Sequence, residues 1–578
     1  MINVSTEYMN LIYEDSTKVD CQVVYGAYDL TGKSSTTPST TDKQDFSNVS
    51  DTLVGVTDFT RYTTLERNHW LLDSETNYFP EDTSKRRWAW WSLSQSDDEG
   101  YFENNPTLIY TWEENHKSVG LQLVFGEPVI EFRINWYNGN GTLIDTYTYT
   151  NDDYNNNVYR IEHGVQNYQK IEIEVLKTFP NHYAKIYSVG FGLEYIWSNE
   201  LINISVNESI SATAQEIQSN QAVISINDID NNYNKYNPQN KLVYLQEGQR
   251  MEVQTITSVN GANEFVPLGI FYLTSWGNPT QYTAEFVAND LIIKLEGQYY
   301  RGKYYENVPA QTIIKDMFDD YNLYVEDDAQ YVIADNVKDV QLTGYIPIMS
   351  YREALQQICF ALGAVCKVNR EGKIYIYRLE DIDVVETIGY DKKQYNGDNE
   401  QTRYGSVSIT EYTYKVKEES ETIFEGEVSG DQTIVFTTPA TNISINGTYS
   451  SYIAYANSLD IFGASGTIVV TGKPYDIYEK KVTKSKEDIP LGITVQNLDV
   501  DGIYLIGNSD TSTYVSNWLL GAIERNITNE FKWLGNPAIE IGDYVDVEVG
   551  EGQTRKAIVT KNNFTYNGAL LETSEVTL

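Results

Sequence analysis

Only four histidines occur in the 578-residue chain, and they limit the hydrolytic chemistry that the sequence can offer. A serine or cysteine nucleophile needs a neighbouring base, usually histidine, because a hydroxyl or thiol attacks poorly without one. No H-E-x-x-H pair is present, and the scattered histidines are His69, His116, His163 and His182. The sequence therefore predicts neither a histidine-dependent nucleophile nor a histidine zinc site in its last two thirds, and these side chains are interpreted as surface or polar-network residues.

Other patterns for catalysis or metal binding also fail. The segment 227–240 reads NDIDNNYNKYNPQN, in which Asp228 and Asp230 are spaced as in a calcium loop. Its sixth position is Tyr233 and its twelfth is Gln239, where that loop requires glycine and glutamate. We interpret the segment as a polar loop between strands. No phosphate-binding glycine loop occurs, and among 82 acidic residues no glycosidase pair can be chosen, so we predict no catalytic residue, metal or cofactor.

The aromatic segment 88–97, WAWWSLSQSD, raises a different possibility, since an exposed indole stacks well on a sugar ring. In a strand Trp88 and Trp90 share one face and Trp91 takes the other. Core packing is the favoured interpretation, because large aromatic side chains are mostly buried. Exposure of Trp91 and contact with carbohydrate is the alternative, and the candidate contact residues are Trp88, Trp91, Tyr154 and His182.

Charge excludes several classes of partner. Acidic residues outnumber basic ones by 82 to 42, giving a net charge of −40, so the surface repels nucleic-acid phosphates and anionic lipid. The simplest interpretation of the negative charge is that it keeps the protein soluble. The more specific interpretation is that it lines a channel through which DNA passes without adhering. The N-terminal residues lack a secretory signal pattern, and no apolar run is long enough to span a membrane. Three cysteines make no disulfide framework, and we expect synthesis and folding in a cytosol.

The elements that would carry these residues are mostly strands. Alternation of apolar and polar residues in VIEFRINWY (129–137) and KIEIEVLK (170–177) indicates strands with one buried face. Short strands of this kind between turn-rich breaks suggest a two-sheet sandwich at about 50–199. Further strands follow at 200–300, and from 383 to the end they return around one predicted helix at 511–527.

A small α+β unit is predicted between these β segments. Helical spacing of apolar residues follows Pro309, and Ser350 with Glu353 forms a capping box that opens a second helix. Gly363 can provide the left-handed cap of that helix, and AVCKVN with KIYIYRL then predicts a hairpin.

Two resemblances to known families add to these patterns. The run WWSLSQSDDEGYFENNPTLIYTW, continued by HKSVGLQLVFGE and QKIEIEVLKTFPNHYAKIYSVGFG, resembles the discoidin-like, galactose-binding-like jelly roll inserted in tail proteins of phages and prophages. The resemblance covers about 85–195. It implies that the segment is mainly structural and consists of strands and a turn. A glycan-binding surface at the loops is the further expectation.

The flanking blocks are similar to phage tail hub, or tail-associated, proteins over about 200–578 and 1–30. They include PLGIFYLTSWGNPTQYTAEFVAND, LTGYIPIMSYREALQQICFALGAVCKVNREGKIYIYRL and WLGNPAIEIGDYVDVEV. This resemblance implies a homotrimer at the end of a tail tube, in which two related β-barrels per chain form a pseudo-sixfold ring beside an α+β domain.

Taken together, the fold class expected is mainly β and multidomain, with β-barrel hub domains, a small α+β domain and an inserted β-sandwich (jelly roll). The expected division is 1–49 with 200–300, 50–199, 301–382 and 383–578. The expected function is the non-enzymatic central hub of a phage-like tail baseplate, located in the virion tail and assembled in host cytoplasm. Its expected partners are tail tube, distal tail, baseplate or fibre proteins and host surface glycan, with DNA only in transit. The alternatives are a peripheral receptor-binding protein and, less favoured, a glycosidase.

Overall fold

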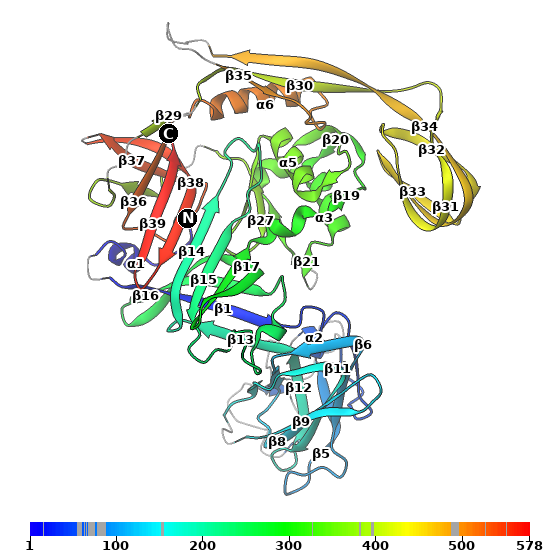
Figure 1. Cartoon of the computed structure of the whole chain (residues 1–578), viewed down its shortest axis with the longest axis vertical. Helices are drawn as coiled ribbons and strands as arrows, with labels where there is room; N and C mark the ends of the chain where they lie inside the picture. Colours follow the sequence, from blue (N-terminus) through cyan, green and yellow to red (C-terminus); the bar gives the residue numbers. More distant parts are fainter. Residues whose placement is uncertain are drawn as a thin grey trace.

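The computed structural model describes the chain except residues 15–16, 55–60, 63, 65, 67–75, 78–87, 152–154, 326–327, 381–382, 395–397, 401, 487–495, 526 and 551. The chain is mainly β and consists of several packed units, which confirms the predicted fold class (Figure 1). His69 and Tyr154 lie outside the described residues. Within the described part, no helix has both the length and the apolar character needed to cross a membrane.

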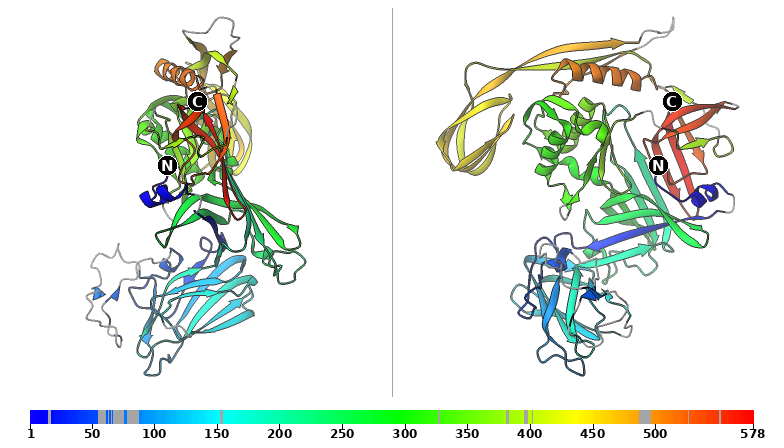
Figure 2. Two further views of the ribbon diagram at one scale, coloured as in Figure 1. Left: turned by 90° about the vertical axis from the view of Figure 1, so that its left-hand side faces the viewer. Right: turned by 180° about the vertical axis from the view of Figure 1, so that it is seen from behind.

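A β-sandwich stands at one end of the molecule (Figure 2). Its two sheets have the orders β10-β7-β12-β5 and β2-β6-β11-β8-β9. The predicted alternation holds, because the apolar residues of β8 and β11 are buried between the sheets and the polar ones face outward. The strands are β2 (Thr37–Ser39), β5 (Trp90–Gln95), β6 (Thr107–Ser118), β7 (Leu121–Phe125), β8 (Glu131–Tyr137), β9 (Leu143–Thr150), β10 (Val158–Ile161), β11 (Val165–Lys177) and β12 (Tyr183–Gly190). Beside them lie α2 (Asp51–Val54), β3 (Arg61–Tyr62) and β4 (Thr76–Asn77).

One large sheet joins the two ends of the chain. Its main path is β13-β1-β16-β17-β18-β15-β14-β38-β39-β36-β29, and β28 and β37 extend from β38. The ladder between β14 and β38 connects the first β segment to the last. The strands are β1 (Val19–Tyr28), β13 (Gly192–Trp197), β14 (Leu201–Ser209), β15 (Gln221–Asn227), β16 (Arg250–Val259), β17 (Ala262–Thr280), β18 (Thr283–Asn289), β28 (Glu386–Ile388), β29 (Asp398–Glu400), β36 (Ile527–Trp533), β37 (Tyr544–Gly550), β38 (Gln553–Tyr566) and β39 (Leu570–Thr577). The short helices α1 (Thr6–Leu11) and η2 (Leu242–Tyr244) accompany it.

The predicted α+β unit is present beside this sheet. Helix α5 (Tyr351–Leu362) has the capping box of Ser350 and Glu353, and Gly363 ends it at φ 58°. Helix α3 (Ala310–Tyr321) begins after Pro309, and β26 (Val365–Val368) pairs with β27 (Ile374–Tyr377) as the predicted hairpin. The other elements are η3 (Leu291–Glu296), β19 (Gln298–Tyr299), β20 (Tyr304–Pro309), β21 (Tyr324–Val325), β22 (Asp328–Ala329), β23 (Tyr331–Ile333), α4 (Asp335–Lys338), β24 (Gln341–Tyr345) and β25 (Met349–Ser350).

A long β arm crosses over the α+β unit (Figure 1). Strand β34 (Ser458–Ser485) pairs with β30 (Tyr404–Val416) near the body of the molecule, and with β31 (Glu421–Val435), β32 (Ala440–Thr448) and β33 (Ser451–Ala454) at its far end. The far end has an apolar core of its own. Strand β35 (Gln496–Val500) runs parallel to β30, and helix α6 (Ser509–Ala522) packs on β30 and β34. The predicted helix at 511–527 is therefore present, but it ends at Ala522.

Candidate functional site

The tryptophans of the segment 88–97 are all buried. Trp88 is 4 % exposed, Trp90 0 % and Trp91 3 %. The expected pairing of Trp88 with Trp90 on one face is wrong, because Ala89 has a φ of 51° and interrupts the alternation just before β5. Trp90 faces the core of the sandwich, whereas Trp88 and Trp91 both pack on Phe46, at ring distances of 5.5 and 5.4 Å.

The favoured interpretation, packing of the indole, holds for Trp91, and the alternative of an exposed Trp91 is wrong. The segment at 42–47, between β2 and β5, covers the outer face of β5 and bonds to it: Gln44 N donates to the carbonyl of Trp91, and Trp91 N donates to Ser47 Oγ. Trp90 Nε1 donates to the carbonyl of Asp42. This covering segment is far away in sequence, so strand periodicity alone could not predict it. The two indole faces are used for packing, and neither is presented to solvent as a stacking platform.

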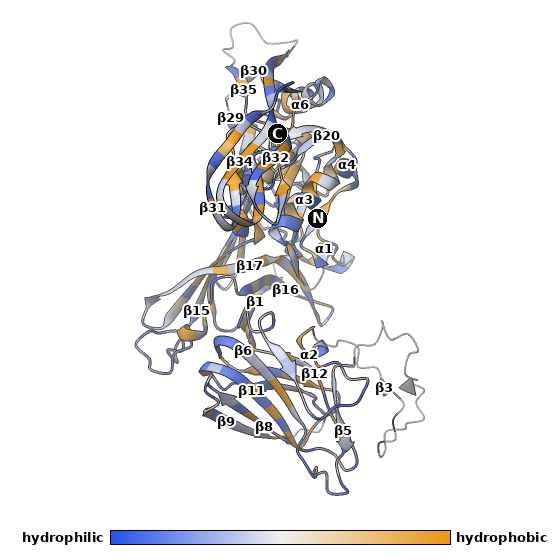
Figure 3. Ribbon diagram, turned by 90° about the vertical axis from the view of Figure 1, so that its right-hand side faces the viewer, coloured by the Kyte–Doolittle hydropathy of each residue, from blue (hydrophilic) through white to orange (hydrophobic). Residues whose placement is uncertain are grey.

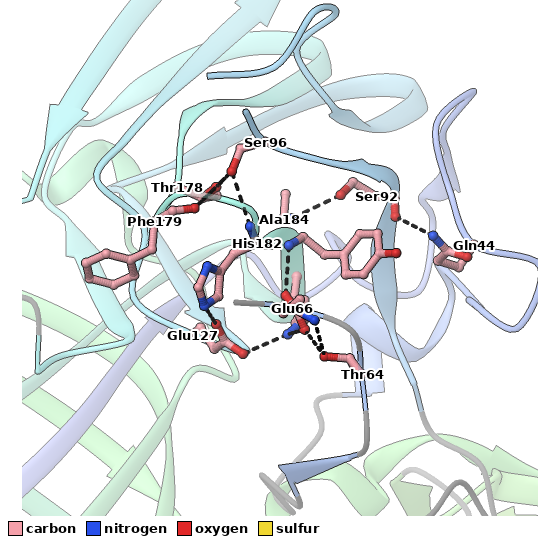
Figure 4. A network of polar contacts seen from close by, with 12 residues as sticks. Gln44, Thr64, Glu66, Ser92, Ser96, Glu127, Thr178, Phe179, His182 and Ala184 are labelled. Carbon is pink, nitrogen blue, oxygen red and sulfur yellow. Dashed lines mark hydrogen bonds and ion pairs between the residues drawn. The ribbon is translucent and has the colours of Figure 1, made fainter. Parts of the chain in front are cut away.

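A buried lysine, Lys185, lies beside Trp91 and bonds to Glu66 and Glu127. Figure 4 labels both glutamates within a network of polar contacts. Lys185 Nζ donates to Glu66 Oε2 and to Glu127 Oε1, both at 2.7 Å, and lies 4.5 Å from the centre of the Trp91 ring. The side chains of Lys185 and Glu66 are 2 % and 0 % exposed. Glu66 also accepts from Tyr183 N and from Thr64 Oγ1, so one carboxylate ties Thr64 and Glu66 to β12. Burying either charge alone would cost several kcal/mol of desolvation free energy; attraction between Lys185 and Glu66 offsets this cost.

His182 belongs to the same network. Its Nδ1 lies 2.9 Å from the carbonyl of Pro180, and its Nε2 lies 3.7 Å from Glu127 Oε2. Glu127 thus links His182 to Lys185, whose ammonium lies over the Trp91 ring. Trp88 packs on the same Phe46 ring as Trp91. Contact of Trp88, Trp91, Tyr154 and His182 with a sugar stays a prediction, and the burial of both indoles weighs against it.

A second buried polar group lies where the sandwich joins the large sheet. His116 Nδ1, on β6, lies 2.5 Å from Oδ2 of Asp29, which directly follows β1, and both side chains are almost fully buried. His116 Nε2 lies 3.4 Å from Ser35 Oγ. Sequence reasoning missed this serine, histidine and aspartate set because the histidine is 81 residues from the serine and 87 from the aspartate along the chain.

The hydrogen bonds indicate a positioning role for this set. Ser35 Oγ donates to the carbonyl of Thr31 at 2.6 Å, a much shorter contact than its 3.4 Å approach to His116. A hydroxyl has one proton to donate, so the proton of Ser35 points away from the imidazole that would have to remove it. Trp112 Nε1 donates to the carbonyl of Gly32 beside it. These hydrogen bonds fix the turn at 29–35 against β6.

A third set of buried charges joins the α+β unit to the large sheet. Arg370 Nη2 donates to Glu208 Oε2 on β14 at 2.9 Å, and Lys367 Nζ donates to the carbonyl of Ile541 at 2.8 Å. Burial raises the pKa of Glu208, although Arg370 opposes the shift. Burial also disfavours the charged form of Glu540, but Lys367 and Arg370 outweigh it and lower the pKa of that carboxyl. These ions hold three parts of the chain in one arrangement.

The calcium-like segment is a polar loop between β15 and β16, as predicted. Asp228 Oδ2 accepts from Tyr233 N at 3.0 Å, and burial raises the pKa of its carboxyl. Among the residues that the structure describes, no group of three or more His, Cys, Asp or Glu side chains is arranged to hold a metal ion.

The structure is similar to two solved tail proteins. A tail protein from Neisseria meningitidis MC58 is 10 % identical, with a TM-score of 0.41, and the match covers 67 % of this chain and 94 % of that one. The 43 kDa tail protein of prophage MuSo2 from Shewanella oneidensis is 11 % identical, with a TM-score of 0.37, over 66 % and 95 % of the two chains.

A shorter match, over 29 % of this chain and 97 % of the other, is to the family 32 carbohydrate-binding module of NanJ from C. perfringens in complex with galactose. It is 12 % identical with a TM-score of 0.19. No family model and no curated protein matches the sequence. With TM-scores below 0.5, these likenesses say nothing about what this chain binds.

Proposed function

We propose that this chain is a non-enzymatic central hub of a phage-like tail baseplate, built as a homotrimer that closes the tail tube and anchors other baseplate proteins. The single observation that carries the proposal is the ladder between β14 and β38, which joins two β units of one chain edge to edge in a continuous sheet. Three such chains would present six β units around an axis, which is what the resemblance to tail hub proteins implies for a hexameric tube. The order of the β and α+β blocks along the chain supports the same assignment.

The buried charges support a rigid, load-carrying role. Arg370 and Lys367 bind groups on both β units, and Asp29 with His116 fixes the base of the sandwich. Each of these sets is buried and bonds to other segments of the chain, as expected of ions that hold those segments together.

We propose a domain division that follows the strand pairing. The sandwich would then start near residue 29, because β2 pairs with β6, and end near residue 191, because β13 pairs with β1. The first β unit would comprise the residues before 29 and those of 192–290, followed by the α+β unit at 291–382, because η3 and β19 pack with α5 and β25, and by the second β unit at 383–578.

The test is the native mass of the full chain, measured by light scattering on a sizing column over a range of concentrations. A mass of three chains is expected, since a closed ring requires a fixed copy number. A monomer at every concentration, and also in the presence of purified tail tube protein, would contradict the trimeric hub.

A peripheral receptor-binding role for the sandwich is the second candidate. It is favoured by the position of the sandwich, which projects from one end of the molecule on β1 and β13 (Figures 1 and 2). Host surface glycan would then bind at its loops. On a glycan array the full chain should bind, and the binding should be lost when residues 29–191 are removed. Equal binding by both proteins would show that the glycan site lies outside the sandwich.

The acidic surface suits a tube through which DNA passes. With a net charge of −40, carboxylates facing the axis would repel phosphates and let the genome move without adhering. Reversal of axis-facing carboxylates to lysine should slow DNA ejection, and unchanged ejection kinetics would contradict this role of the charge.

A further inference from the structure

A groove lies between helix α5 and the last strand of the β arm. Strand β35 ends its side of the sheet β31-β34-β30-β35, and no other strand in the described part of the chain pairs with its outer edge. Beside this edge lies a cavity of about 690 Å³, which has the size of a ligand-binding site. Figure 3 shows β30 and β35 together at the end of the molecule opposite the sandwich. An unpaired strand edge presents N–H and C=O groups that another extended chain can bind.

Hydrogen bonds within the chain hold the walls of this groove. On α5, Gln357 Nε2 donates to the carbonyl of Gly502 at 2.7 Å, and Gln357 Oε1 accepts from Tyr504 N at 3.2 Å. These bonds fix α5 to the segment that follows β35. Gln356 Nε2 donates to the carbonyl of Ala214 at 2.9 Å, which ties α5 to a further part of the chain. A groove that is formed before binding loses little conformational entropy when a ligand enters it.

The floor of the groove is apolar. Leu498 and Val500 of β35 line it and pack against the core of the α+β unit, in which Phe360 of α5 is fully buried. Asp499 lies between the two apolar residues of β35 and is exposed. The strand therefore turns an apolar face towards α5 and a polar face outward.

The rim of the groove is acidic. Its lining includes Glu353, Asp499 and Asp501, and no lysine, arginine or histidine is among the described residues that line it. One lysine, Lys481, bonds to this set, through Asp499. A hydrogen bond from Tyr412 lowers the pKa of Asp501, so this carboxyl stays ionised at neutral pH. Three carboxylates and one ammonium leave a formal net charge of −2, which favours a cationic ligand.

We propose that this groove binds an extended segment of another protein, in which apolar and basic residues alternate, as a further strand beside β35. Alternate side chains of a strand point to opposite faces of a sheet. An added strand would direct its apolar side chains to the floor of Leu498 and Val500, and its basic side chains to the face that carries Asp499. The inference goes beyond the proposed hub, because the groove lies within one chain and does not need the trimer.

Short peptides of defined composition test the proposal on the full chain. A fluorescein-labelled hexapeptide of alternating valine and lysine should bind saturably in fluorescence anisotropy, and the same peptide with glutamate in place of lysine should not bind. Two N-methylated forms of the valine–lysine peptide report strand addition, since one blocks the valine amides and the other blocks the lysine amides. Only alternate residues of a strand bond to a given neighbour, so one form should lose about tenfold or more in affinity and the other should not.

A charge-reversal variant locates the binding site. Asp499→Lys should weaken binding of the valine–lysine peptide by about tenfold or more, because it replaces a carboxylate at the rim by an ammonium. Glu425→Lys, at an exposed carboxylate of β31, makes the same change in net charge and is the matched control. Circular dichroism checks that both variants are folded. In the wild-type chain, the bound peptide should slow deuterium exchange of the backbone amides at 496–500.

Failure of the groove and failure of the hub give different results. Absence of saturable binding below about 1 mM peptide, equal affinities of the two methylated peptides, or equal losses in the two variants overturns the groove and leaves the hub in place. A chain that stays monomeric but gives the expected peptide results overturns the trimeric hub and supports the groove.

Discussion

At the scale of single residues, buried charges with distant partners fix the sandwich in place. Asp29→Asn removes the carboxylate from His116 while both positions remain buried. Because the buried imidazole then loses a hydrogen bond to a charged group, we expect the free energy of unfolding of the sandwich to fall by about 2 kcal/mol. Denaturant unfolding followed by tryptophan fluorescence measures it.

The matched variant at this site is Ser35→Ala, which removes an exposed hydroxyl 3.4 Å from His116. We expect a loss of less than about 1 kcal/mol. Neither variant should alter hydrolysis of p-nitrophenyl acetate relative to wild type. A hydrolysis rate that drops in both variants would contradict the positioning role.

Glu66→Gln tests the network around Lys185. The neutral amide leaves Lys185 with only the partly exposed Glu127 as a charged partner, so the unfolding free energy should fall by about 3 kcal/mol. The ammonium lies over the Trp91 ring, so the fluorescence spectrum should also change in the native state. Glu127→Gln is the control at the more exposed partner and should cost less. An equal loss from both would show that burial of the carboxylate does not decide the effect.

The raised pKa of Glu572 predicts how the free energy of unfolding depends on pH. Burial raises its pKa from 4.5 to about 8. Between these values the native state holds a proton that the unfolded state has lost, so this residue makes stability fall as pH rises, by about 1.4 kcal/mol for each pH unit. Glu572→Gln should flatten the decline between pH 5 and pH 8, measured by urea unfolding against pH. If the decline of the unfolding free energy with pH is unchanged, another group titrates in this range. Asp290, whose pKa is raised by burial to about 7, is then the next residue to replace.

At the scale of elements, Gly363 controls how α5 meets α6. Its φ of 58° disfavours any residue with a Cβ, and an added Cβ would lie 2.8 Å from Tyr514 Cε1 and 3.1 Å from the Trp518 ring. Gly363→Ala should therefore destabilise the protein by more than about 2 kcal/mol. Gly141→Ala is the control, because Gly141 has a φ of 75° but nothing within 4 Å, so only the backbone cost of about 1 kcal/mol applies. Similar losses would mean that α6 adjusts to the added methyl group.

The elements also show how far sequence reasoning reaches. Alternation located β8 and β11, and the capping box of Ser350 located α5, because each of those signals is contained within a few neighbouring residues. The faces of the tryptophans could not be predicted, since a single left-handed residue, Ala89, shifts the register. Lys185 was missed because its partner Glu66 is 119 residues away. Local patterns determine elements, whereas long-range contacts decide which of their faces are covered.

At the scale of the whole molecule, the sandwich is inserted between two strands that pair with each other. Tyr28 and Gly192 are register partners in the ladder of β1 and β13. A chain in which a short glycine-rich turn replaces residues 29–191 should therefore fold and keep the oligomeric state of the full chain, as measured by circular dichroism and light scattering. A shortened chain that aggregates, while the excised sandwich folds alone, would show that the large sheet depends on the insert.

Strand β34 is 28 residues long and changes partners along its length. Its first part lies on the small core at the far end of the arm, and its last part pairs with β30, on which α6 packs. Such a strand spans roughly 90 Å if fully extended. One continuous strand joins the arm tip to the sheet on which α6 packs, so we expect a load on the tip to reach α6 through the covalent backbone, and α5 through the contact of α6 with Gly363. A protein bound to the arm tip would then be expected to exert torque on the centre of the molecule without touching it.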